Sequence, residues 1–226
     1  MKVRLISHSK PSNVLRGVPV DGADSVDDCQ DLIAYCARVS NPSNQNNKKT
    51  SEKLIKYLIK NQHWSPLEMV SACLEIETTR DIARQILRHR SFSFQEFSQR
   101  YADPTKDLSF ETREARLQDP DNRQNSVELE SGSSIENAWY HTQQEVIKSA
   151  KEAYEWAIEN GIAKEQARAV LPEGLTMSRM YMNGTLRSWV HYIDLRSANG
   201  TQKEHADIAK ECAKVITEIF PLMKDI

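Results

Sequence analysis

The chain has 226 residues, of which 39% are hydrophobic and 27% are charged, and its formal net charge is −2. This composition is typical of a soluble globular protein, and the length is enough for one substantial core, so we expect a single domain over residues 1–226. The slightly acidic balance argues against a general nucleic-acid-binding protein, whose domain is usually basic.

The first elements are predicted from hydrophobic spacing. Residues 2–7 alternate between apolar and polar and predict a strand. Ser25 can cap a helix that runs to about Arg38. Residues 41–50 are a polar loop, and a second helix follows it and ends before His63.

A strand and an arginine-bearing helix come next. Residues 68–78 alternate, which predicts a half-buried strand. Residues 80–90 have the spacing of a helix that buries Ile82 and Ile86. After Arg90 the alternation of serine and phenylalanine indicates a return to extended chain.

The C-terminal half begins with a long polar excursion over residues 103–133, and loops of this length are commonly functional or disordered. Ser133 and Glu136 can form a capping box at the start of the next helix, which ends near Gly161.

The remaining elements follow without a clear linker. They are a short helix that carries Arg168, a strand over 174–183, a helix over 185–195, and a last helix that begins with a capping box of Thr201 and Glu204.

Three classes of protein are disfavoured. The first eight residues contain no apolar run long enough for a signal peptide, and no stretch approaches a membrane span. The four cysteines have neither CxxC spacing nor a matching histidine pattern, so we expect buried free thiols, no metal site and a cytoplasmic location, in a bacterial cell or in a host cell if the source is viral.

Arginine is concentrated in two stretches without lysine. Five arginines lie between positions 80 and 100, with no lysine between Lys60 and Lys106. Four more lie between Lys164 and Lys203. Arginine binds phosphate and carboxylate through a planar fork, so the two stretches could line one polyanion pocket, within the fold or with a neighbouring subunit. The alternative is that these arginines neutralise buried carboxylates. The nine are Arg80, Arg84, Arg88, Arg90, Arg100, Arg168, Arg179, Arg187 and Arg196.

His89 stands between two of these arginines, which disfavours its protonation. A neutral histidine that positions a ligand is therefore expected there, rather than a general acid. Glycine-rich phosphate loops are absent, so a bound dinucleotide would not lie on a Rossmann fold.

The run from Arg88 to Tyr101 resembles the signature of flavin-dependent thymidylate synthases. It matches Arg-His-Arg followed by serines and an Arg-Tyr pair at fixed spacing, and it has Gln95 where the family commonly has Asn. The matching residues are Arg88, His89, Arg90, Ser93, Ser98, Arg100 and Tyr101.

The resemblance implies an α/β (α+β) fold with a mainly antiparallel sheet flanked by helices. It also implies FAD as cofactor, the substrate dUMP, the co-substrates methylene-tetrahydrofolate and NADPH, and a homotetramer with active sites at subunit interfaces. In that family reduced flavin serves the methylation of dUMP, and no enzyme cysteine attacks the pyrimidine.

Site residues are carried over by position. Arg196 would lie against the uracil and stabilise developing negative charge as the catalytic residue. His191 stands where the family often has Asn. Residues implied at dUMP are Gln85, Arg88, Glu96, Ser98, Gln99, Arg100, Arg168 and Arg196. Residues implied at FAD are Ser40, His63, Ser65, Glu68, Arg88, His89, Arg90, Gln95, Glu96, Arg187 and His191.

Two other functions remain open. The arginine helix could belong to a nucleotide- or RNA-binding module, which would bind polynucleotide with steep salt dependence and would hold no flavin. The chain could also be an inactive scaffold of the same fold.

Overall fold

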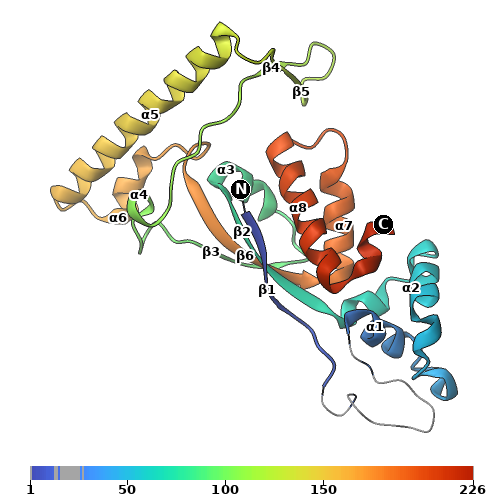
Figure 1. The fold of residues 1–226 in the computed structure, drawn as a ribbon. Helices are drawn as coiled ribbons and strands as arrows, with labels where there is room; N and C mark the ends of the chain where they lie inside the picture. Colours follow the sequence, from blue (N-terminus) through green and yellow to red (C-terminus); the bar gives the residue numbers. More distant parts are fainter. Residues whose placement is uncertain (1, 13–14, 16–25, 27, 226) are drawn as a thin grey trace.

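The computed structural model describes residues 2–12, 15, 26 and 28–225. A four-stranded sheet in the order β1-β2-β6-β3 lies at its centre, and each neighbouring pair is antiparallel (Figure 1). β4 and β5 form a separate two-stranded ribbon. The strands are β1 (Lys2–His8), β2 (Ser71–Thr79), β3 (Ser93–Glu96), β4 (Arg116–Gln118), β5 (Ser126–Glu128) and β6 (Met177–Thr185).

Helices flank this sheet, which confirms the α+β class with a mainly antiparallel sheet. In the described part of the chain the α-helices are α1 (Cys29–Ala37), α2 (Ser51–Lys60), α3 (Arg80–Ile86), α4 (Pro104–Asp107), α5 (Ser134–Glu159), α6 (Lys164–Ala167), α7 (Leu186–Ser197) and α8 (Lys203–Ile219). The short 3-10 helices are η1 (Pro42–Asn44), η2 (Lys48–Thr50), η3 (Ser65–Met69), η4 (Arg168–Val170) and η5 (Pro221–Asp225).

The main core lies between the sheet and the pair α7 and α8. Alternate residues of β2, among them Leu74 and Ile76, point into it, and Met180 of β6 joins them. Trp189 of α7 is fully buried, and its Nε1 donates a hydrogen bond to the Ala72 carbonyl at 3.0 Å. This bond satisfies the only polar atom of the indole and fixes α7 against the middle of the sheet.

The first helix begins later than its sequence suggested. Asp28 caps α1, because its Oδ1 accepts a hydrogen bond from the Asp31 amide at 2.8 Å. Ser25, the expected cap, lies outside the described residues. The strand at the N-terminus and the helix before His63 are confirmed as β1 and α2.

Two predicted boundaries around the arginine helix are wrong. Residues 65–69 form η3, with Pro66 in its first turn, so β2 begins at Ser71 rather than at Glu68. The helix predicted to reach Arg90 ends at Ile86. The chain turns there because Phe92 enters the core, where its ring lies 4.8 Å from that of Trp189.

The excursion over 103–133 is ordered in part. It contains α4 and the ribbon of β4 and β5, and the Glu111 amide donates to the Leu175 carbonyl at 2.9 Å beside the start of β6. The Ser133 cap is confirmed, since its Oγ accepts from the Glu136 amide at 3.2 Å. The long α5 stands apart from the sheet (Figure 1), and its C-terminal half packs on α6 and η4 through a small separate core that includes Tyr154 and Leu171.

The predicted capping box at the last helix is wrong. α8 begins at Lys203, and Gln202 occupies its cap position without a side-chain capping bond. Glu204 instead accepts a hydrogen bond from Arg116, 88 residues earlier in the chain. β6 also starts later than predicted, at Met177, whereas the helix predicted over 185–195 is confirmed as α7. Among the described residues no helix is long and apolar enough to cross a membrane.

Gly184 provides a test of how the turn after α3 is held. A Cβ at this position would lie 2.4 Å from the Phe92 ring, a contact that forces the ring to move. We expect Gly184→Ala to lower the free energy of unfolding by about 1–3 kcal/mol, and the melting temperature by about 2–4 °C per kcal/mol. Gly174→Ala is the matched control, because its nearest atom lies 4.0 Å away. Equal melting temperatures for the two variants would show that Phe92 is not tightly seated.

Candidate active site

His89 and Arg196 make the contact at the centre of the predicted site. His89 lies in the turn after α3 and Arg196 in the last turn of α7, and Arg196 Nε donates a hydrogen bond to His89 Nε2 at 2.9 Å. Burial, and then the charges of Arg196 and Arg88, lower the pKa of His89 to about 4. His89 is therefore neutral at pH 7 and carries its proton on Nδ1. It acts as an acceptor that orients a guanidinium group.

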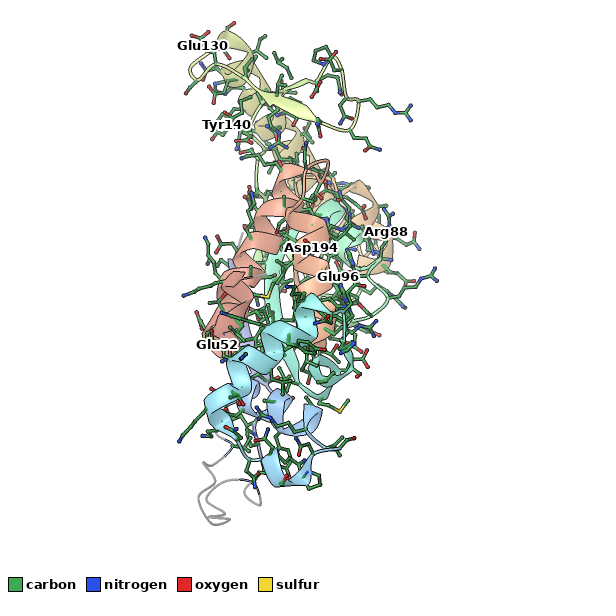
Figure 2. All side chains as sticks on the ribbon, turned by 90° about the vertical axis from the view of Figure 1, so that its right-hand side faces the viewer. Glu52, Arg88, Glu96, Glu130, Tyr140 and Asp194 are labelled. Atoms are coloured by element: carbon green, nitrogen blue, oxygen red, sulfur yellow. The ribbon has the colours of Figure 1, made fainter. Side chains whose placement is uncertain are left out.

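Arg88 and Arg90 flank this histidine and are exposed. Neither forms an ion pair with any residue that the structure describes. Figure 2 shows Arg88 at mid-height of the molecule, near the level of Glu96 and far from the Tyr140 end of α5. Two guanidinium groups without a carboxylate partner leave their planar N–H forks available to an anionic ligand.

The nine arginines of the two lysine-free stretches divide into two groups within the described chain. Five pair with carboxylates, and the alternative of neutralising a buried carboxylate fits the pairs of Glu96 and Glu77, which are largely shielded, but not those of the exposed Glu165 and Glu68. The five are Arg80 and Arg84 with Glu96, Arg100 with Glu165, Arg179 with Glu77, and Arg187 with Glu68. The four without a carboxylate are Arg88, Arg90, Arg168 and Arg196, and all four belong to the predicted site.

Glu96 has a structural role at the end of β3. It lies 3.5 Å from the buried Arg80, and Ser178 Oγ donates a hydrogen bond to its Oε1 at 2.8 Å. Its other oxygen lies 3.9 Å from Arg84. The carboxylate thus balances a buried guanidinium beside the sheet, and its predicted contacts with both ligands stay predictions.

The loop after β3 meets η4 through a shared partner. Arg100 pairs with Glu165 at 3.2 Å, and Arg168 Nε donates to the Glu165 carbonyl at 3.3 Å, so two arginines far apart in sequence come together. Ser98 Oγ accepts from the Arg100 amide at 3.4 Å. Gln99 is buried, yet its Nε2 has no hydrogen-bond partner in the described structure. A buried donor without a partner, one residue before Arg100, fits a ligand with acceptor oxygens.

Three of the residues predicted at FAD lie near η3 and α7: Glu68, Arg187 and His191. Glu68 on η3 forms an ion pair with Arg187. The His191 ring stands edge-on to Trp64 at 4.5 Å. Both side chains of the ion pair and His191 are exposed, so this surface is open to solvent.

The remaining predicted FAD residues are more dispersed. Ser40 lines a surface pocket between α1 and α2 that also includes Tyr57, and the His63 ring lies 6.1 Å from Tyr57. Ser65 begins η3, and Gln95 is exposed on β3. The structure therefore places Ser40 and His63 on one side of the η3 surface and Gln95 on the edge strand.

Gln85 on α3 meets two residues that the sequence analysis did not assign to the site. Its amide contacts Gln202 and His205, at the start of α8. His205 could have been found, because it shares the buried stripe of α8 with Ile208 and Cys212, and a histidine at a buried helical position is unusual. Gln202 had no such signal.

The cysteines lie apart from these contacts. All four are free; Cys29 and Cys212 are buried as expected, whereas Cys36 and Cys73 are only half-buried. Over the described ranges no cluster of three or more histidine, cysteine, aspartate or glutamate side chains could hold a metal ion.

Comparison with known proteins identifies relatives along nearly the whole chain. A family model described as "thymidylate synthase complementing protein" matches residues 23–222. A probable flavin-dependent thymidylate synthase of Paramecium bursaria Chlorella virus 1 is 47% identical over 98% of this chain and 96% of its own. A flavin-dependent thymidylate synthase of Synechocystis is 46% identical over the same shares.

A solved structure agrees at the level of the fold. The UMP/dUMP methylase PolB of Streptomyces cacaoi, bound with 5-Br dUMP, superposes with a TM-score of 0.76 over 99% of this chain and 93% of its own, at 24% identity. Because the family model covers most of the chain and two relatives exceed 45% identity, the chain belongs to the flavin-dependent thymidylate synthase family.

Proposed function

We propose that this protein is an FAD-dependent thymidylate synthase that converts dUMP to dTMP. Methylene-tetrahydrofolate would be the carbon donor and NADPH the reductant. The observation that carries the proposal is the Arg196–His89 hydrogen bond, flanked by the two unpaired guanidinium groups of Arg88 and Arg90. The relatives from the Chlorella virus and from Synechocystis, named as a probable and as a flavin-dependent thymidylate synthase, support the same reaction.

The substrate dUMP would lie where the loop after β3 approaches η4. Arg168 has no carboxylate partner, and the unpaired Gln99 Nε2 offers a buried donor. Both properties suit a phosphate, which brings negative charge and acceptor oxygens. We assign the remaining contacts with dUMP to Gln85, Arg88, Glu96, Ser98, Arg100 and Arg196.

FAD would extend from the Arg88–Arg90 turn to the surface of η3. The unpaired Arg88 and Arg90 fit its pyrophosphate, and the half-buried Trp64 with the exposed His191 offers an aromatic surface for a flat ring. When bound and reduced by NADPH, the flavin would supply the hydride chemistry. We assign its other contacts to Ser40, His63, Ser65, Glu68, His89, Gln95, Glu96 and Arg187.

Arg196 is the residue to which we assign catalysis. Its Nε is committed to His89, which leaves the terminal nitrogens free to donate to a uracil oxygen where negative charge develops. A neutral His89 costs no charge repulsion beside this guanidinium. The pair therefore presents an oriented cation whose position is set before the substrate binds.

The cysteines support a reaction without a thiolate nucleophile. Burial raises the pKa of Cys29 to about 11, and it also raises the pKa values of Cys36, Cys73 and Cys212. A thiol with a raised pKa is protonated at pH 7 and is a poor nucleophile. Activation of the pyrimidine is thus left to the flavin and the arginines.

We also infer a homotetramer whose active sites are completed between subunits. α5 carries an exposed seam next to the row that packs on its own core, with Trp139 43% and Trp156 60% exposed. The seam residues recur at alternating steps of three and four, which is the spacing of helix-packing surfaces, and they are Ile135, Trp139, Thr142, Val146, Ser149, Ala153 and Trp156. Exposed large apolar side chains in a row mark a protein contact surface.

The function is tested by spectrum and turnover. We expect the purified protein to show a flavin absorbance spectrum, to release FAD on denaturation, and to form dTMP from dUMP in the presence of methylene-tetrahydrofolate and NADPH. A colourless protein that does not take up added FAD would refute the proposal. Bound flavin without dTMP formation would indicate an inactive scaffold, and salt-dependent binding of polynucleotide by a flavin-free protein would indicate the RNA-binding alternative. As a control on the assignment, Arg196→Ala should reduce dTMP formation by about 10²–10³-fold or more with the fold retained, whereas Arg123→Ala in the excursion should retain turnover. Near-normal turnover of Arg196→Ala would refute its catalytic role.

Two buried neutral histidines predict how stability depends on pH. The pKa values of His89 and His205 are lowered to about 4, chiefly by burial, whereas both side chains titrate near pH 6.5 in the unfolded chain. Between these values the unfolded state binds protons that the folded state does not, so the free energy of unfolding should fall as the pH drops from about 6.5 to 4. The expected slope is roughly 1 kcal/mol per pH unit for each histidine.

Denaturant unfolding at a series of pH values measures this slope. His89→Gln should flatten the slope and His141→Gln on the surface of α5 should not; an unchanged slope in His89→Gln would contradict the assignment.

The α5 seam predicts a change of assembly. Replacing both Trp139 and Trp156 by Gln should lower the molar mass measured by light scattering, because each indole buried at a contact contributes about 1.5–3 kcal/mol. Tyr140→Gln is the matched control, since Tyr140 is comparably exposed but belongs to the row of α5 that faces its own core. Retention of the tetramer mass by the double variant would exclude the seam as the interface.

A further inference from the structure

The Gln85 side chain is held by two polar neighbours from the start of α8. Its Nε2 donates a hydrogen bond to Gln202 Oε1 at 2.7 Å, and its Oε1 lies 3.3 Å from His205 Nδ1. Both partners are more than 100 residues away in sequence. The Gln85 amide therefore has one defined orientation, with one N–H still unassigned.

The contact continues beyond Gln202 to a carboxylate. Gln202 Nε2 donates to Glu204 Oε2 at 2.9 Å, and Arg116 Nη2 donates to Glu204 Oε1 at 2.6 Å. Arg116 and Glu204 are each only 14% exposed in their side chains, so this ion pair is largely shielded from solvent. Arg116 belongs to β4, in the excursion over 103–133.

The charge of Glu204 decides which group donates and which accepts in each hydrogen bond from Glu204 to Gln85. An ionised carboxylate can only accept, so Gln202 must turn its NH₂ toward Glu204 and its carbonyl oxygen toward Gln85. Gln85 must then present its own NH₂ to Gln202 and its oxygen to His205. Burial opposes ionisation of Glu204, but hydrogen bonds from its own backbone amide, Gln202 and Arg116 lower its pKa on balance.

His205 closes the chain at the other end. It is fully buried, and burial with the charge of Arg196 lowers its pKa to about 4, so it is neutral. To donate to Gln85 it must carry its proton on Nδ1, and its buried Nε2 has no partner among the described residues. Each residue in the series His205, Gln85, Gln202 and Glu204 then donates a hydrogen bond to the next one.

The excursion is attached to the first turn of α3 and to the start of α8. Arg116 reaches α8 beside Gln85, and Arg113 Nη2 donates to Asp81 Oδ1 at 2.7 Å and to Thr79 Oγ1 at 2.6 Å at the first turn of α3. Gln143 of α5 in turn fixes the Arg113 backbone, with its Oε1 accepting from the Arg113 amide at 2.8 Å. The excursion is thus joined to the helix that carries Gln85 rather than packed loosely beside it.

We propose that Gln202 and Glu204 are positioning residues that orient the Gln85 amide as a donor toward the phosphate of dUMP. We call the hydrogen-bonded series Gln85, Gln202 and Glu204 the relay, and Arg116 of the excursion fixes its Glu204 end. The inference rests on the proposed function, which places Gln85 at dUMP. With the amide in the opposite orientation, a carbonyl oxygen would face the phosphate and repel it. The relay thus raises the affinity for dUMP through residues that do not touch it.

Glu204→Gln tests the relay, because it keeps the shape but removes the charge that sets the direction of the amides. In the holoenzyme we expect the KM for dUMP, and its Kd by calorimetry, to rise about tenfold, the order of one hydrogen bond to a charged group. The kcat should stay within twofold of that of the unaltered protein, and the flavin absorbance spectrum should be unchanged. Glu114→Gln is the matched control, since Glu114 is the other carboxylate on Arg116, at 2.5 Å, and lies outside the relay. It should leave the KM for dUMP unchanged.

Gln202→Met tests the relay if Glu204→Gln does not fold. This variant is expected to fold, because Gln202 lies in the loop before α8 and its side chain makes no capping bond there. It should give the same rise in KM at constant kcat. If both variants bind dUMP as tightly as the control, or if the control loses affinity equally, the relay is refuted. If the unaltered holoenzyme itself does not bind dUMP, the proposed function fails instead, and the two failures are distinguished.

Discussion

The hydrogen bond between Arg196 Nε and His89 Nε2 connects the end of α7 to the turn after α3, and it exists only while the histidine is neutral. Each side is positioned by the core of the sheet. Trp189 bonds the Ala72 carbonyl and fixes α7, and Phe92, seated against Gly184, fixes the turn. Burial and two neighbouring cations keep His89 unprotonated, so the same packing that forms the core also keeps it an acceptor.

The distribution of carboxylates decides what each arginine can do. Arg179 meets Glu77 across two strands at 2.6 Å, and Arg80 meets Glu96 at the end of β3, so these guanidinium groups stabilise the sheet and its edge. Breaking such a partly buried pair costs more than the pair contributes, because one charge is left without a partner. Arg88 and Arg90 lie in the same stretch without a carboxylate and are exposed, where an unpaired cation costs little. The residue type was visible in the sequence, but the division between arginines with and without a carboxylate partner required the fold.

Local patterns predicted most elements, and long-range contacts account for the errors. The alternation at Ala72, Leu74 and Ile76 predicted β2 because one face of that strand is buried by α7 and α8. The end of α3 was missed because it is set by the burial of Phe92 against residues nearly 100 positions later. The capping box at α8 was wrong for the same reason: Arg116 engages Glu204 from 88 residues away. The ligand assignments came from the resemblance of the Arg88–Tyr101 run, since no spacing rule distinguishes a flavin from another anion.

The exposure of the candidate site links catalysis to assembly. A guanidinium in water interacts with a phosphate only weakly, because the solvent screens charge and competes for each hydrogen bond. Arg88, Arg90, Arg187 and His191 all lie on open surface in one chain, so a ligand held there would keep much of its hydration. Only a surface that covers these side chains, from the ligand or from another subunit, removes that water and makes the oriented donors effective.

α5 extends away from the sheet (Figure 1) and carries apolar side chains that its own chain does not cover. The helix that would join the subunits is attached to the relay that orients Gln85, because Gln143 of α5 fixes the backbone of the excursion at Arg113. In the proposed tetramer, the α5 contact and the proposed dUMP site would therefore be connected through the excursion, by way of Arg113 and Arg116.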